Sequence, residues 1–247
     1  MASKIIVDQL EKTGGALTAL TLPVANATVG QYLKNDGAGV LGWVDPPADV
    51  SGFDRFTVVT ASNATFALQS TTTKLVIEVQ ASGGTAGSTD SSAYSGGNGG
   101  GGAYAMKQLT GITGATDQLN ITIGAVAGIA ATGTTTSVAQ AGTASFTTIT
   151  CDGGNGGISA AGGYTDGGVG GDIPTTGDLN IKGGNGRKGG TYQAGAGGAW
   201  MARENGMTTS GVGMQSAGYG GGGGQGYGVS VAGGAGSSGA VIVWEYK

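Results

Sequence analysis

Gly96-Gly97-Asn98-Gly99-Gly100-Gly101-Gly102 and Gly220-Gly221-Gly222-Gly223-Gly224 are the stretches that decide the fold of this chain. Glycine makes up 56 of the 247 residues, and most of it follows position 83 in doublets and runs. Glycine loses more conformational freedom on folding than any other residue, and it contributes no side chain to a core. A chain this rich in glycine therefore either stays disordered or packs backbone against backbone.

The remaining composition favours order and excludes some classes of protein. Charged residues are only 11% of the chain with a net charge of -4, whereas disordered chains are typically rich in charge. Proline occurs 4 times and glycine does not recur at every third residue, which excludes collagen. The pI near 4.6 and the absence of a basic stretch argue against nucleic acid as a partner.

Several chemistries lack their usual residues. The chain has no histidine, which removes the commonest general base and metal ligand. Its single cysteine, Cys151, cannot form an intramolecular disulfide or a zinc site. No early segment has the apolar length of a signal peptide or membrane span. We therefore expect a protein that is made in a cytoplasm, is not exported through a signal peptide and does not insert into a membrane.

The first fifty residues predict a small β module. Residues 31–34 and 40–44 flank an Asn-Asp-Gly step that supplies positive φ cheaply, as a hairpin needs. The stretch 45–49 contains two prolines and indicates a stiff linker, so we expect one module over 1–50 and a second over 51–247. The first module has too few large apolar groups for an independent core, a problem that association with further copies would solve.

The second module is predicted to be β-rich, with no helical period. Expected strands cover residues 56–60, 65–68, 74–80, 119–123, 144–150 and 240–246. The terminal run Ala-Val-Ile-Val-Trp-Glu-Tyr is β-branched and aromatic, and it suits pairing with residues 75–79. Such pairing closes the domain over the glycine-rich stretch, so we favour order over disorder.

The tetrad Gly-Gly-Asn-Gly occurs at 96–99, 153–156 and 183–186, at irregular spacing that excludes a fixed-period solenoid. Without Cβ atoms, extended chains can approach laterally and pair N–H with C=O. Weak contacts of about 0.5–1 kcal/mol each oppose an ordering cost of about 1–2 kcal/mol per residue. We therefore predict polyglycine-II-like segments held by a β scaffold. The alternative is that the runs are flexible linkers.

The order of these segments resembles the glycine-rich domain of bacteriophage tail-fibre proteins. The resemblance covers residues 53–247 and rests on the strand 75–79 leading into Gly83-Gly84, on 119–124, and on the closing residues 239–244. Residues 22–43, with Gly30-Gln31-Tyr32-Leu33-Lys34-Asn35-Asp36-Gly37, resemble a short module at the start of virion structural proteins of marine phages.

These resemblances imply an all-β fold: a β-sandwich-like domain with ordered polyglycine-II-like segments, preceded by a small β module. In the family, loops that connect the glycine segments contact a bacterial surface receptor, protein or glycan. The N-terminal module then attaches to other virion proteins and supports a homotrimer. The expected location is the virion, in a tail fibre or other external appendage, after synthesis in the cytoplasm of the bacterial host.

Candidate chemistry is weak by comparison. Residues 183–190 approach a phosphate loop but lack its Lys-Ser/Thr ending. Four loop carboxylates could bind Ca²⁺, but their spacing matches no known loop and favours solvated turns: Asp152, Asp166, Asp172 and Asp178. Cys151 is expected to be a buried residue beside a strand end. We expect no catalytic residue, no bound metal and no cofactor.

Large side chains between the glycine runs are the better candidates for binding. Residues 199–207 form the longest stretch of large and charged side chains in the late glycine region. Trp and Arg are the usual anchors of interfaces, and Tyr suits recognition loops. The predicted receptor-binding residues are Tyr164, Tyr192, Trp200, Arg203 and Met207. For 199–207, contact with a receptor and contact between subunits remain equal alternatives.

Two other functions remain open at this point. A purely structural virion component, such as a capsid decoration or a tail spacer, would share the fold without any receptor. A polysaccharide depolymerase would need two carboxylates in a cleft, and the sequence offers no basis for choosing a pair. We therefore expect a binding protein that is not an enzyme.

Overall fold

The computed structural model describes residues 9–10, 20–21, 23, 25–29, 31–35, 40–45, 52–89, 94–126, 128–142, 145–190, 213–226 and 230–247. The chain divides into two compact units, Met1–Gly52 and Phe53–Lys247. Each unit has its own strands.

The N-terminal unit contains two short antiparallel pairs. Strand β1 (Gln9–Leu10) pairs with β2 (Leu20–Thr21), and β3 (Tyr32–Asn35) pairs with β4 (Leu41–Val44). The second pair is the hairpin that the Asn-Asp-Gly step predicts. The indole Nε1 of Trp43 donates to the carbonyl of Ala25 at 2.7 Å, which ties the hairpin to the preceding segment. None of the described side chains of this unit is buried.

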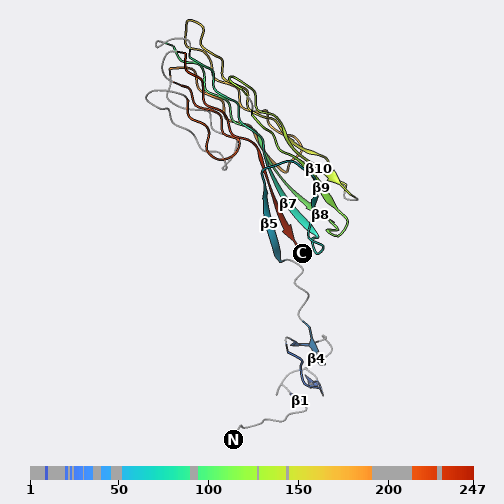
Figure 1. The fold of residues 1–247 in the computed structure, drawn as a ribbon. Coiled ribbons are helices and arrows are strands. Elements are labelled where there is room, and N and C mark those ends of the chain that lie inside the picture. Colours follow the sequence, from blue (N-terminus) through green and yellow to red (C-terminus); the bar gives the residue numbers. More distant parts are fainter. Residues whose placement is uncertain are drawn as a thin grey trace. The chain divides into compact units, whose positions relative to one another are not determined.

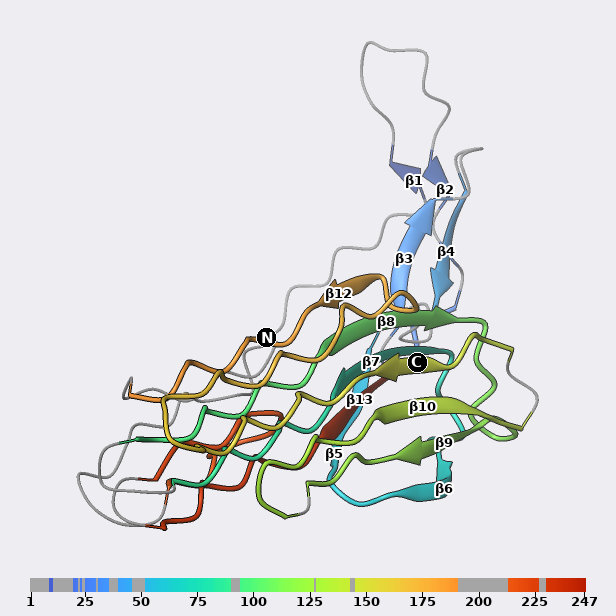
Figure 2. The same ribbon diagram turned by 90° about the horizontal axis from the view of Figure 1, so that it is seen from above.

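The second unit carries two antiparallel sheets. One sheet has the order β12-β8-β7-β13-β5, formed by β5 (Phe53–Val59), β7 (Lys74–Gln80), β8 (Tyr104–Thr110), β12 (Leu179–Ile181) and β13 (Ala240–Tyr246). The other has the order β11-β10-β9-β6, formed by β6 (Asn63–Ala67), β9 (Gln118–Thr122), β10 (Thr136–Ala141) and β11 (Ile149–Cys151). Figure 1 and Figure 2 show the strands together at one end of the unit.

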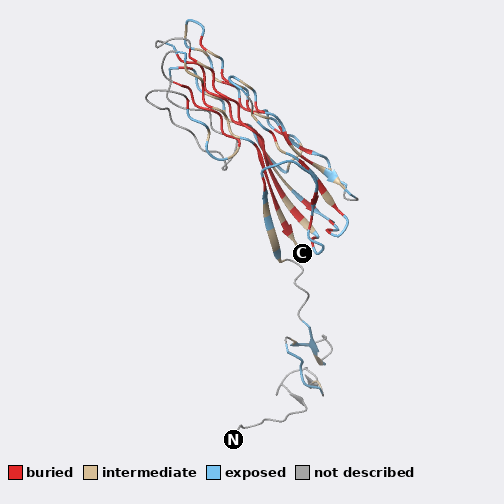
Figure 3. Cartoon of the chain, viewed as in Figure 1, coloured by how far each residue is buried: buried red, intermediate tan, exposed pale blue. Residues whose placement is uncertain are grey.

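The hydrophobic core lies between the inward faces of these sheets. Leu75, Ile77 and Val243 from the first sheet join Ile121 and Val138 from the second, and all five are buried (Figure 3). The described residues contain no helix. The predicted all-β, β-sandwich-like fold with ordered glycine-rich segments is confirmed.

Strand predictions succeeded best where β-branched residues are dense. Residues 74–80 form β7, and the predicted pairing of the terminal strand with it is confirmed, with Val241 opposite Val79. The strand predicted over 144–150 is wrong in extent, because residues 145–148 are not in a strand and β11 spans only Ile149–Cys151. Strands β8, β10 and β12 were not predicted, since small and polar residues dilute their β signal.

The glycine-rich segments continue from the strands and run side by side away from the sheets (Figure 1, Figure 2). We call this set of segments the glycine lattice; its described members are residues 81–89, 94–103, 130–135, 152–160, 165–172, 182–190, 213–226 and 231–239. They have no regular strand pairing over most of their length, yet many are buried. For these described segments the flexible-linker alternative is wrong.

The lattice is held by backbone hydrogen bonds that repeat every third residue. Segment 97–103 shows the pattern. The N–H groups of 97, 100 and 103 donate to carbonyls in residues 152–158. Those of 98 and 101 donate to residues 184–187, and those of 99 and 102 donate to residues 220–223. Three residues per turn is the period of the polyproline-II helix, which has no hydrogen bonds of its own. Each turn therefore bonds three separate neighbours, as the polyglycine-II-like prediction requires.

Close backbone approach explains why the lattice needs glycine. A Cβ added at Gly99 would lie 2.0 Å from the carbonyl oxygen of Gly84, and one at Gly154 would lie 2.1 Å from that of Gly100. The asparagines of the tetrads add further bonds to neighbouring segments: Asn98 Oδ1 accepts from the N–H of Gln225, and Asn185 Oδ1 accepts from that of Gly170, both at 2.9 Å. Backbone and amide groups thus replace the missing side-chain packing.

Candidate functional site

Loops that connect lattice segments meet at the end of the lattice remote from the sheets. We call the described part of this region the loop end, residues 88–89, 94–95, 158–166 and 187–190. Its segments are joined by backbone contacts: the N–H of Ala160 donates to Ser88 O at 2.9 Å, and the N–H of Gly189 donates to Thr165 O at 2.8 Å. The turn around 158–166 is the yellow one in Figure 1. The loop end is therefore anchored on the lattice by ordinary hydrogen bonds.

Two tyrosines form an exposed pair at the loop end. The rings of Tyr94 and Tyr164 meet edge to face, with centroids 5.5 Å apart and planes at 81°. Their side chains are 37% and 51% exposed, so the pair presents a large aromatic area to solvent. Gly190 has a φ of +85°, and a Cβ there would lie 2.9 Å from the Tyr164 ring. The ring of Tyr164 thus lies against the backbone at Gly190. Glycine suits this position because it adopts positive φ without strain and has no Cβ to collide with the ring.

Other groups around this pair give the loop end mixed chemistry. The Lys188 ammonium lies 3.8 Å from the Asp166 carboxylate, and both side chains are exposed. Ile158 is exposed in the same turn, and the hydroxyl of Thr165 donates to the Ile158 carbonyl at 2.5 Å. Rigid aromatic area beside charged and apolar groups is a composition that recognition loops often have.

Sequence reasoning located part of this surface. Tyr164 was predicted as a binding residue, and the structure places it exposed on the loop end. Tyr192, Trp200, Arg203 and Met207 lie outside the described residues. Tyr94, one of the aromatic residues between the glycine runs, was not among the predicted binding residues, because no sequence signal links it to Tyr164, 70 positions further along the chain. Tyr104, in contrast, is buried in the sheet, where its hydroxyl donates to Glu78 at 2.8 Å.

Each candidate carboxylate has a lysine or hydroxyl partner, and two of the four, Asp152 and Asp172, line the same groove. Asp166, Asp172 and Asp178 lie 3.8, 4.0 and 3.8 Å from the ammonium groups of Lys188, Lys182 and Lys107. Asp152 Oδ1 accepts from the Thr135 hydroxyl at 3.3 Å. No group of three or more metal-ligating side chains occurs within the described ranges. Residues 183–190 belong to the lattice, with no strand-to-helix turn of the kind that binds phosphate.

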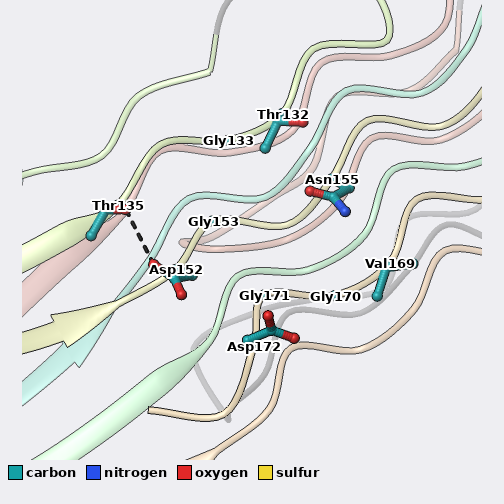
Figure 4. Close-up of a pocket in the computed structure, with 10 residues that line it drawn as sticks. All are labelled: Thr132, Gly133, Thr135, Asp152, Gly153, Asn155, Val169, Gly170, Gly171 and Asp172. Carbon is teal, nitrogen blue, oxygen red and sulfur yellow. Dashed lines mark hydrogen bonds between the residues drawn. The ribbon is translucent and has the colours of Figure 1, made fainter. Parts of the chain in front are cut away.

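An open polar groove crosses the side of the lattice (Figure 4). It has a volume of about 420 Å³, and Asp152, Asn155 and Asp172 extend from its walls with Thr132 and Thr135. Its floor is glycine backbone at Gly133, Gly153, Gly170 and Gly171. The polar side chains are largely exposed to water, so no desolvated group selects a particular ligand.

Cys151 ends β11 and is completely buried, as the sequence predicts. The pKa of its thiol is raised to about 12, mainly by burial and then by the neighbouring Asp152 carboxylate. A backbone hydrogen bond with Ala105 lowers this pKa by a smaller amount. The thiol donates to the Val79 carbonyl at 3.4 Å. A neutral, enclosed thiol is a packing group at ordinary pH and is not a nucleophile.

No protein-family model matches this chain, and no curated protein matches it either. Among the described residues there is no helix of the length and hydropathy needed to cross a membrane.

Proposed function

We propose that this chain is a phage virion fibre or adhesin protein that binds the host cell surface through loops on a glycine-rich β scaffold. One observation carries the proposal: the lattice brings Tyr94 and Tyr164 together as an exposed pair on connecting loops, far from the hydrophobic core. Loops that carry function are typically held by a rigid scaffold. The resemblance to phage tail-fibre domains gives this scaffold its biological setting.

The lattice suits such a task for a physical reason. Each internal segment is bonded to several neighbours along its length, so the ends of the segments are fixed with little help from the loop sequences. The loops can then differ in length and composition without loss of the fold, because long surface loops cost little closure entropy. Binding through side chains on these loops needs no catalytic group.

The N-terminal unit supplies the second half of the proposal. Tyr32, Leu33, Val40 and Val44 of its hairpin are all exposed, and exposed apolar side chains in such a small unit indicate an interaction surface. We propose that this unit attaches the chain to other virion proteins and supports a homotrimer. A chain that sediments as a monomer at micromolar concentration would contradict the homotrimer.

The receptor proposal is tested with particles that carry the Tyr94→Ala, Tyr164→Ala double variant. We expect adsorption to the bacterium on which the particle grows to fall roughly ten-fold, the effect of losing about 1.4 kcal/mol of binding free energy. The control is Ile173→Ala, which removes an exposed apolar side chain outside the loop end. Particles whose adsorption is unchanged by the double variant would remove the tyrosine pair from the site.

A further inference from the structure

An aromatic cluster occupies the outer face of the five-stranded sheet. Phe56 lies opposite Trp244 across the β5–β13 pair, and Phe53 lies opposite Tyr246 at the bulge. Ring centroids are 5.2 Å apart for Phe56 and Trp244 and 5.9 Å apart for Phe53 and Tyr246. Val58 extends the same face beside Ile242. We call these six residues the aromatic face.

The aromatic face is open to solvent on its edge-strand side. Phe53, Phe56 and Val58 are 53%, 56% and 43% exposed, whereas Val59 and Val243 on the inward face are buried in the core. Figure 3 shows exposed residues along β5 beside the buried strands of the sheet. Of the strands in this sheet, β5 pairs only with β13. A contiguous aromatic patch on an edge strand marks an interaction surface, because edge strands are normally protected by charge or cover.

The cluster is held in a defined arrangement and does not depend on a partner to form. The Trp244 indole Nε1 donates to Glu78 Oε1 at 2.8 Å, and the other carboxylate oxygen of Glu78 accepts from the Tyr104 hydroxyl. Lys74 Nζ lies 5.5 Å from the centroid of Tyr246. Prearranged aromatic rings lose little conformational entropy when they bind, which is why such residues anchor interfaces.

We infer that the aromatic face is a contact between copies of this chain. The two charged groups that contact its rings are opposite in sign, Lys74 on Tyr246 and Glu78 on Trp244, so a second copy meets no excess of like charge. Phe53 is also the first residue of its unit. The preceding residues 46–51 can span at most about 20 Å.

The inference rests on the proposed self-association of the N-terminal unit. Copies joined there would hold their aromatic faces on short tethers, and a short tether raises the effective concentration of one face for another. The face would then contribute association through its rings while the loop end, on separate segments of the unit, stays available for binding. The alternative is that an unrelated virion protein binds the aromatic face.

Cross-linking between introduced cysteines tests this contact in the full chain. Val58→Cys places a thiol on the aromatic face, and the buried native Cys151 does not compete for reagent. The control is Thr122→Cys on β9, an exposed position of the other sheet. With a short bismaleimide cross-linker, we expect most of the Val58→Cys chain to become covalently joined to a second copy, and almost none of the Thr122→Cys chain.

Sedimentation of the same samples separates the possible failures. An oligomer in which Val58→Cys cross-links no more than Thr122→Cys would overturn the aromatic-face contact alone and leave N-terminal association standing. A monomer would overturn both. Substitution of Phe56→Ser should reduce cross-linking through Val58→Cys several-fold. Unchanged cross-linking in that variant would mean that residues 46–51 alone hold the two Val58→Cys positions close together, and it would overturn the contribution of the rings.

Discussion

Arg55 and Glu245 form an ion pair across β5 and β13, with Arg55 Nε 2.5 Å from Glu245 Oε1. The Glu245 side chain has no exposed surface, and its other carboxylate oxygen accepts from the N–H of Gln69 and the hydroxyl of Thr72. One carboxylate thus joins the last strand of the chain to the first strand of its unit and to the connection that follows β6. This joint lies in the sheets, at the end of the unit remote from the loops.

Replacement of Glu245 by Gln should destabilise the second unit. The amide has one acceptor oxygen for three donors and no charge to balance Arg55, so we expect the free energy of unfolding to fall by about 2–3 kcal/mol. Urea denaturation measures the change. The control is Asp166→Asn, which breaks an exposed ion pair worth less than about 1 kcal/mol. An equal effect of the two substitutions would contradict the structural importance of Glu245.

The glycine lattice predicts opposite outcomes for two Gly→Ala substitutions. At Gly99 the new Cβ would meet backbone oxygen at 2.0 Å, so we expect a loss of at least about 1–3 kcal/mol of stability, because packed segments must separate. At Gly163 nothing lies within 4 Å and φ is not positive, so alanine should be neutral or stabilise by about 0.4–1 kcal/mol. Thermal denaturation compares them, and equal melting temperatures would contradict close backbone packing at Gly99.

The sequence predicts the sheet better than it predicts the lattice, and the difference is physical. Strands β7 and β13 are rich in Val and Ile, which favour strands, so the sequence identifies both strands. Lattice segments are bonded through backbone groups that every residue carries, so their sequences do not say which segments are neighbours. Strand β12, only Leu179–Ile181, owes its existence to pairing with β8 rather than to its own pattern.

The candidate site was likewise only partly predictable, because the sequence does not show which segments are neighbours. Tyr164 could be selected because an aromatic residue in a glycine background has few other roles. Its pairing with Tyr94 depends on how two lattice turns meet at Gly190, and that arrangement cannot be predicted from the sequence. The aromatic face was missed for a different reason: residues 56–60 were predicted as a strand, but alternation alone does not show which face another layer covers.

Cys151 should make stability depend on pH in the alkaline range. The pKa of the folded thiol is about 12 against an ordinary value of 9.0, so the unfolded chain loses this proton first as pH rises. Above pH 9 the unfolded state therefore binds fewer protons, and this thiol lowers the unfolding free energy by up to about 1.4 kcal/mol per pH unit. The contribution present at lower pH is lost progressively up to pH 12.

Comparison with Cys151→Ala isolates that contribution from other alkaline titrations. Urea denaturation at pH 9 and pH 10 should show a smaller drop in stability for the variant than for the native chain. Thiol labelling by an aromatic disulfide reagent gives an independent measure, since native Cys151 should react only as fast as the chain opens. Rapid labelling in the absence of denaturant would contradict the burial of the thiol.

The last prediction concerns the segment 199–207, whose large side chains were selected from the sequence for contact with a receptor or with another subunit. In particles carrying Trp200→Ala and Arg203→Ala, we expect adsorption to fall at least roughly thirty-fold, because a single Trp or Arg anchor contributes about 2 kcal/mol or more to an interface. The matched control removes one apolar and one cationic side chain elsewhere, Ile173→Ala with Lys182→Ala, both exposed in the structure.

Sedimentation of the purified Trp200→Ala, Arg203→Ala variant separates receptor contact from subunit contact. Reduced adsorption with an unchanged oligomer supports receptor contact, whereas a smaller oligomer assigns Trp200 and Arg203 to a contact between subunits. Normal adsorption and a normal oligomer would exclude both roles for Trp200 and Arg203.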